Sequence, residues 1–275
     1  GFLLDTTGGM LGLRNWQWMF IIEGLAACVV GVIAFFYLTS RPRDAKWLSA
    51  EERTALENEI ALEDSSKLAH GPGTALAALK DAQVLRFVLI YFAIQVSVYG
   101  VIFYLPTRIS ELTGSAIGLE VGLLTAIPWF CALVALGFVT RYADASGKHR
   151  QLAGWMLGLA ATGILCSTLG NQLVPVLAAF CVATVGFVVV QPLFWSLPTA
   201  YLAGPAAASG IALIGSIGNL GGFIAPTLKN AVETAFHSQR AGMFALAAAG
   251  FIGILLLLSI GAASRRAGAL KLKAS

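Results

Sequence analysis

The chain has 275 residues, of which 57% are hydrophobic and 12% are charged, whereas a soluble globular domain carries roughly 25% charged residues. This shortage of charge, together with thirty glycines, excludes an ordinary soluble domain and predicts an integral membrane protein. The net charge of +4 comes from basic residues in short stretches between apolar runs, a pattern that indicates orientation in a lipid bilayer and argues against nucleic-acid binding.

The first apolar interval lies close to the start of the chain. The chain opens with Gly1 rather than Met, and its first eleven residues look like the tail of an apolar segment, so we expect a further part of the protein before it. A helix needs about 20 apolar residues to cross a bilayer, and Asn15 to Ser40 supplies them with Glu23 as the one charged side chain. Glu23 is a candidate for proton handling, and an interfacial or helix-pairing role is the alternative.

The stretch from Arg41 to Gln83 is the only long polar segment. Ser49 followed by Glu52 forms a capping-box pattern, which predicts a short helix over residues 51–63. The sequence His70-Gly71-Pro72-Gly73 is expected to end that helix, and a second one should resume over residues 74–81. Because so few large apolar groups cannot make a core, we predict a cytoplasmic linker between two membrane units.

Charge-free intervals predict the remaining membrane spans. Single spans are expected over residues 87–107, 121–140 and 241–264, which lack charged residues. Residues 151–228 contain no Lys, Arg, Asp, Glu or His, and this interval is long enough for three spans, with turns at residues 170–172 and 202–205. The total is seven. These runs are about twice as long as the strands of a membrane barrel, so the predicted fold is all-α.

Lysine and arginine predict the orientation of these helices. Because successive spans alternate in direction, the loops fall into two sets, and one set holds fourteen of the eighteen basic residues. The other set holds four, namely Arg14, Arg108, Lys229 and Arg240. Loops rich in Lys and Arg stay in the cytoplasm, so the larger set should be cytoplasmic.

Polar residues inside the spans are the candidates for function, because such residues usually face a cavity or a partner helix. Gln95 and Tyr99 are four residues apart and share one helical face. Asn219 lies in a glycine-rich span, where its amide needs partners. Ser196 and Thr199 lie beside Pro192 and Pro198, which should kink or break their helix. For each side chain, a plain hydrogen bond to a neighbouring helix is the alternative reading.

No catalytic or metal-binding constellation is recognisable. Motifs of the GxSxG or HExxH type are absent from the sequence, and the three histidines fall in separate loops. The four cysteines lie in apolar runs without metal-type spacing, so we interpret them as buried apolar groups. The sequence therefore predicts no enzyme activity, no metal and no cofactor.

Several stretches resemble a known family of transporters. The loop Asp144-Ala145-Ser146-Gly147-Lys148-His149-Arg150 resembles the cytoplasmic loop motif of the major facilitator superfamily, in which Asp144, Gly147, Lys148 and Arg150 would latch adjacent helices. Further stretches are similar to the anion:cation symporter family within that superfamily, which includes tartrate, phthalate and hydroxyphenylacetate transporters. These stretches cover residues 16–24, 44–53, 99–106, 121–128 and 216–222.

The resemblance implies a twelve-helix transporter, of which the seven spans would be helices six to twelve. Residues 1–40 would then end the N-terminal helical bundle, residues 41–83 would join the two halves, and residues 84–275 would form the C-terminal six-helix bundle. The resemblance also implies that the central cavity is lined by the polar residues of the spans: Gln95, Tyr99, Ser196, Thr199 and Asn219.

The implied function is proton-coupled uptake of a small organic anion, a carboxylate, by alternating access between two bundles. We expect a multi-pass monomer in the bacterial inner membrane, with the lipid bilayer, the anion and the proton as its partners. Within transport the alternative is efflux of drugs or metabolites. Outside transport it is a membrane receptor or scaffold, which the short stretch after Arg266 does not favour.

Overall fold

The protein is described here by a computed structural model that covers residues 12–39 and 41–274. Between these bounds the chain is helical and carries no β-strand. The elements in chain order are α2 (Asn15–Tyr37), the 3-10 helix η2 (Pro42–Asp44), α3 (Ala50–His70), α4 (Ala75–Lys80), α5 (Ala82–Thr113), α6 (Leu119–Ser146), α7 (His149–Ser167), α8 (Leu173–Tyr201), α9 (Gly204–Phe236) and α10 (Gln239–Ala274).

Each of the seven expected spans corresponds to one long helix. Six of these, within the described residues, are long and apolar enough to cross a membrane. The seventh, α7, is a 19-residue helix that begins with three polar residues, His149, Arg150 and Gln151, which lower its mean hydropathy. It nevertheless packs lengthwise between α8 and α10 in the bundle. The predicted all-α membrane fold is therefore confirmed.

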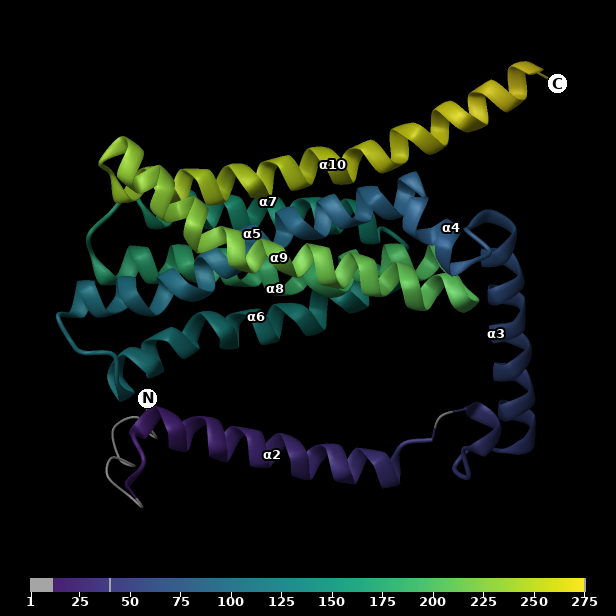
Figure 1. Ribbon diagram of the computed structural model, residues 1–275, viewed down its shortest axis with the longest axis horizontal. Coiled ribbons are helices and arrows are strands. Elements are labelled where there is room, and N and C mark those ends of the chain that lie inside the picture. The colour runs from purple at the N-terminus through teal and green to yellow at the C-terminus, as the bar shows by residue number, and fades with distance from the viewer. Residues whose placement is uncertain (1–11, 40, 275) are drawn as a thin grey trace.

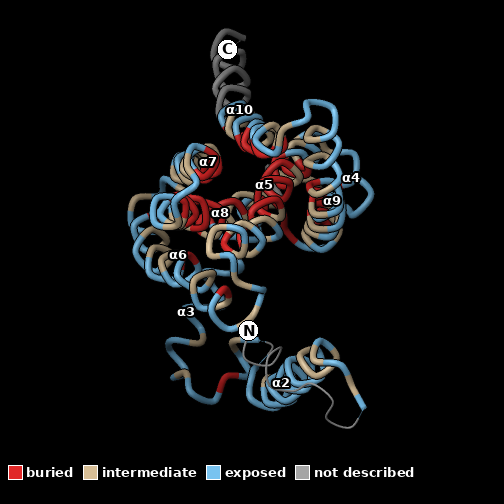
Figure 2. Tube along the Cα trace, turned by 90° about the vertical axis from the view of Figure 1, so that its left-hand side faces the viewer, coloured by how far each residue is buried: buried red, intermediate tan, exposed pale blue. Residues whose placement is uncertain are grey.

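Helices α5 to α10 form an arc whose two central members are α5 and α8 (Figures 1 and 2). Helix α7 packs along α8 and α10, and α10 packs along α5. Helix α6 packs on α8 at one end of the arc, and α9 packs on α5 at the other. Burial is concentrated where α5 and α8 meet their neighbours (Figure 2). The arc is therefore open on the side between α6 and α9.

Glycines allow the closest helix contacts in this bundle. Gly163 of α7 faces the backbone of α8 at Ala183, and Gly186 of α8 faces the backbone of α7 at Ala160. A β-carbon at either glycine would collide with main-chain atoms. Glycines of α9 play the same part against α5, as expected for a small-residue helix face.

The α8 prolines do not break their helix, contrary to one of the two effects expected of them. Helix α8 continues from Leu173 to Tyr201 through both Pro192 and Pro198, so neither proline breaks it. Helices α5, α6 and α9 likewise run through an internal proline. In a membrane, neighbouring helices and side-chain hydroxyls satisfy the backbone groups that a proline frees.

Helix α2 is set apart from the arc, and α3 crosses the space between them (Figure 1). None of the residues of α2 is buried, although the helix is apolar enough to cross a membrane. The predicted capping box is confirmed, because the Ser49 hydroxyl accepts from the Glu52 N–H and the Glu52 carboxylate accepts from the Ser49 N–H. Helix α3 extends to His70, seven residues beyond the predicted end, and Thr74 caps α4.

Candidate functional site

Three amide side chains are linked across three helices at the centre of the arc. The Nε2 of Gln191 on α8 donates to the Oε1 of Gln95 on α5 at 2.9 Å. The Nε2 of Gln95 donates to the Oδ1 of Asn219 on α9 at 2.6 Å. Gln95 is only 5% exposed, whereas Gln191 is half-buried and Asn219 is exposed. We call these three residues the amide chain.

The amide chain has unequal ends. An amide offers two N–H donors and a carbonyl acceptor, and each end group uses one of its atoms in the chain. Asn219 keeps its NH2 group as donor at one end, and Gln191 keeps its carbonyl as acceptor at the other. A ligand that both accepts and donates, such as a hydroxylated acid, matches these two ends, whereas an apolar ligand would leave them unpaired.

Aromatic side chains surround the amide chain on α5 and α8. Tyr91 stacks on Phe194 with centroids 5.2 Å apart and meets Trp195 edge-on at 4.9 Å. Gly218 packs against the ring of Tyr91, and Gly222 packs against the ring of Tyr99. Tyr99 is half-buried and lies one helical turn from Gln95. The glycines of α9 thus bring Asn219 close to α5, as packing surfaces.

Ser196 and Thr199 lie apart from the amide chain. The Ser196 hydroxyl donates to the carbonyl of Leu193, and the Thr199 hydroxyl donates to carbonyls of its own helix. Both line a cavity of about 410 Å³ with Glu63 and Lys67 of α3. The structure therefore places these two predicted residues where the linker helix meets α8.

The loop motif and Glu23 lie elsewhere. Gly147 ends α6 in the left-handed conformation with φ of 64°, a geometry that glycine adopts without strain. The Nε2 of His149 lies 3.0 Å from Asp144 Oδ1, at hydrogen-bond distance. Glu23 is exposed on α2.

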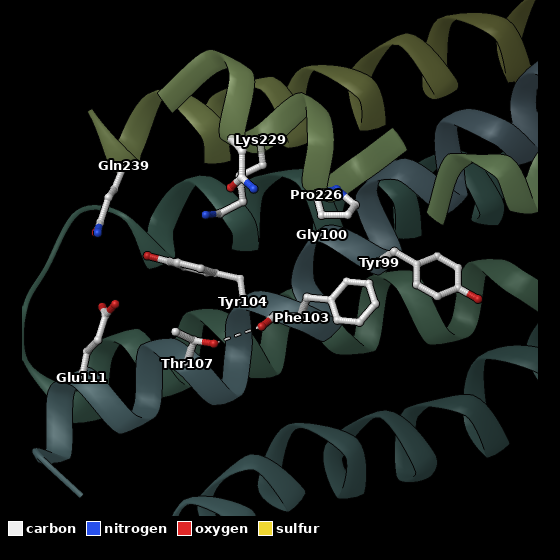
Figure 3. Close-up of a pocket in the computed structure, with 10 residues that line it drawn as sticks. Tyr99, Gly100, Phe103, Tyr104, Thr107, Glu111, Pro226, Lys229 and Gln239 are labelled. Carbon is white, nitrogen blue, oxygen red and sulfur yellow. Dashed lines mark hydrogen bonds between the residues drawn. The ribbon is translucent and has the colours of Figure 1, made fainter. Parts of the chain in front are cut away.

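A second polar region lies at the other end of α5 and α9, near the start of α10 (Figure 3). A cavity of about 280 Å³ extends from Tyr99 to Gln239 and is also lined by Tyr104 and Lys229. The Lys229 ammonium lies 5.0 Å from the Tyr104 ring centre and 2.8 Å from the Glu233 carboxylate. Sequence reasoning missed this region, although Lys229 and Glu233 are four apart, a spacing typical of helical ion pairs.

Comparison with known proteins decides the family. The family model described as "Major Facilitator Superfamily" matches residues 1–226 of the chain. The chain belongs to the major facilitator superfamily. The family, the membrane fold and multi-pass insertion in a bacterial inner membrane were thus predicted correctly from the sequence.

Members of the superfamily with similar sequences are named as transporters. The inner membrane transport protein RhmT of Escherichia coli is 42% identical over 94% of this chain and 59% of its own length. A protein of Agrobacterium vitis named as a tartrate transporter is 36% identical over 94% of this chain and 57% of its own. The quinolone resistance transporter of Acinetobacter baumannii is 31% identical over 92% of this chain and 58% of its own. The chain thus spans a little under three fifths of these relatives.

Proposed function

We propose that the protein imports a small hydroxylated carboxylate together with protons, by alternating access. The observation that carries the proposal is the amide chain, because it leaves hydrogen-bonding groups of both kinds on the half-buried Gln191 and the exposed Asn219. Burying such groups in a membrane bundle is costly unless a partner satisfies them. A hydroxylated ligand held between Asn219 and Gln191 satisfies both ends.

The amide chain recognises the neutral part of the substrate. Residues 151–228, which supply Gln191 and Asn219, contain no charged side chain. The cation that balances the carboxylate therefore comes from outside this region, and we propose that the part of the protein before residue 1 supplies it. Glu23 on the separate helix α2 is the candidate within this chain for carrying the proton.

The relatives support a carboxylate as the transported molecule. The Agrobacterium vitis relative is named for tartrate, a dicarboxylate with two hydroxyl groups, which is the pattern of donors and acceptors that the amide chain matches. Two bundles that rock around a site near the middle of the membrane would expose it alternately to each side. On this proposal, the protein acts as a monomeric transporter without an enzymatic step.

Efflux of aromatic drugs is the second candidate function. Trp195, which is half-buried and packs against the buried, stacked rings of Tyr91 and Phe194, offers an aromatic surface one helical turn from Gln191. A relative is named for quinolone resistance. This candidate requires that the aromatic surface, rather than the amide chain, contacts the transported molecule.

Uptake into liposomes separates the two candidates. The full-length protein is reconstituted, and accumulation of labelled tartrate and related hydroxy acids is followed under an imposed proton gradient. We expect accumulation above the external concentration, which a protonophore abolishes. Failure to accumulate any of the acids would refute the proposal, and gradient-driven movement of a fluoroquinolone in the same vesicles would favour efflux.

A further inference from the structure

A cavity at the end of the bundle remote from the linker is built from hydrogen-bond donors. It has a volume of about 440 Å³, within the range of about 300–1,000 Å³ that is usual for small-molecule sites. Arg108 of α5 and Arg240 of α10 line it, and none of its described lining residues carries a carboxylate. We call this cavity the outer pocket, because both arginines belong to the loop set expected outside the cytoplasm.

Arg108 is held in place by an ion pair and a hydrogen bond on its guanidinium. Its Nη1 lies 3.0 Å from Glu111, and its Nη2 donates to the side chain of Asn171 at 2.8 Å. The Arg108 side chain is only 15% exposed, and its Nε is buried without a hydrogen-bond partner. The guanidinium is therefore fixed beside Glu111, which balances its charge, so Arg108 offers the pocket hydrogen-bonding groups rather than net charge.

Arg240 and the start of α10 add positive potential to the same cavity. Ser238, Gln239 and Arg240 all line it, and α10 begins at Gln239. The first N–H groups of a helix lack partners within the helix, and its N-terminus carries a partial positive charge. Arg240 is exposed and has no carboxylate within ion-pair distance among the described residues, so its charge is available to a ligand.

The outer pocket adjoins the cavity that leads toward the amide chain. Tyr104 and Gln239 line both cavities. The second cavity extends from Gln239 at one end to Tyr99 at the other (Figure 3), and Tyr99 is one turn from Gln95. The adjoining cavity is lined by one cation, Lys229, and one carboxylate, Glu111, so the unbalanced positive charge lies in the outer pocket, at Arg240.

We propose that the outer pocket binds small oxyanions, of the carboxylate class, through Arg108, Arg240 and the first turn of α10. The further statement that this is where the transported anion first docks rests on the proposed function. Guanidinium groups bind carboxylates with paired, charge-assisted hydrogen bonds, and an exposed positive pocket raises the local concentration of anions.

Charged thiol reagents test the pocket without requiring transport. The full-length protein, with its native cysteines replaced, carries Ser238→Cys as reporter and is purified in an uncharged detergent. Anionic sulfonatoethyl and cationic trimethylammonioethyl methanethiosulfonates are compared. We expect the anionic-to-cationic rate ratio to be at least about fivefold higher at this site than at Ala116→Cys in the α5–α6 loop, because the positive charge of Arg240 and the start of α10 favour the anion. Gln239→Cys is the second reporter if Ser238→Cys misfolds.

Protection by the ligand completes the test. At constant ionic strength, tartrate or inorganic sulfate should slow the anionic reagent at Ser238→Cys, and adding Arg240→Gln should remove both the protection and the rate preference. Arg14→Gln, an arginine of the same loop set outside the pocket, is the matched control and should change neither. Equal rate ratios at the two reporters, or no protection by either anion, would overturn the proposal. Tartrate uptake without protection would support the proposed function and refute anion binding in the outer pocket. Protection without uptake would support anion binding in the outer pocket and refute the proposed function.

Discussion

At the scale of single residues, Gln95 connects the largest number of partners in the candidate site. Its carbonyl accepts from Gln191 and its NH2 donates to Asn219, so both functional atoms are used within the protein. Because it is 5% exposed, Gln95 positions the two end groups, and Gln191 and Asn219 are the members that a ligand can reach. The sequence identified Gln95 and Asn219 as candidates, but their pairing joins residues far apart in the chain and could not be predicted.

Replacing Gln95 tests this positioning role. Gln95→Leu removes two hydrogen bonds, each worth about 1 kcal/mol, and lets the amides of Gln191 and Asn219 turn away from the ligand. We expect kcat/KM for uptake to fall roughly tenfold. Ser97→Ala is the matched control, because the Ser97 hydroxyl bonds only to the carbonyl of Leu246 on the opposite face. Equal uptake by Gln95→Leu and wild type would contradict the role of the amide chain.

Glu52 gives a residue-scale prediction on pH. The hydrogen bond from the Ser49 backbone N–H, and then that from its hydroxyl, lower the pKa of Glu52. A lowered folded-state pKa means that the carboxylate stabilises the start of α3 above its unfolded pKa, and that this stabilisation is lost as pH falls through the folded value. In a peptide of residues 45–71, we expect circular dichroism to show helix loss on acidification, and a smaller loss for Glu52→Gln, which keeps an acceptor but does not titrate. Identical pH profiles for the wild-type and Glu52→Gln peptides would contradict this role of Glu52.

At the scale of elements, charge-free intervals predicted which segments would be helices, because a bilayer accepts few charges and demands internal hydrogen bonding. Together with turn-type residues, they located the turns at residues 170–172 and 202–205, which separate α7, α8 and α9. They could not predict that α8 passes unbroken through Pro192 and Pro198, since this depends on neighbouring helices. Nor could they predict that the hydroxyls of Ser196 and Thr199 donate to carbonyls of α8 itself, beside α3. A run of uncharged residues does not reveal where along the helix a polar side chain meets its neighbours.

The α7–α8 contact gives the prediction at this scale. Gly163→Ala or Gly186→Ala places a β-carbon against the backbone of the other helix, and such overpacking costs about 1–3 kcal/mol. We expect a lower melting temperature in detergent for each variant. Gly154→Ala on α7 is the matched control, because nothing lies near its β-carbon position. Equal melting temperatures for Gly163→Ala and Gly154→Ala would show that the helices are not so closely packed.

At the scale of the whole molecule, both the arc of α5 to α10 and the separate helix α2 leave surface uncovered. The arc is open between α6 and α9 (Figure 2), and the amide chain ends at the exposed Asn219 of α9, while α2 is largely apolar and has no buried residue. The sequence led us to expect a further part of the protein before residue 1, and we propose that this part packs on α2 and closes the site. Along the bundle, the outer pocket is then followed by the cavity that ends at Tyr99 and next by the amide chain.

The central claim is that the amide chain borders water and substrate, whereas the outer helices border lipid. Accessibility of two cysteines in the cysteine-free full-length protein tests it most directly. Asn219→Cys lies at the amide chain, and Trp155→Cys on α7 is 75% exposed beside the apolar groove of Ile254 and Leu258. We predict that a membrane-impermeant maleimide labels Asn219→Cys in membranes and that Trp155→Cys stays unlabelled. An unlabelled Asn219→Cys beside a labelled Trp155→Cys would contradict the account.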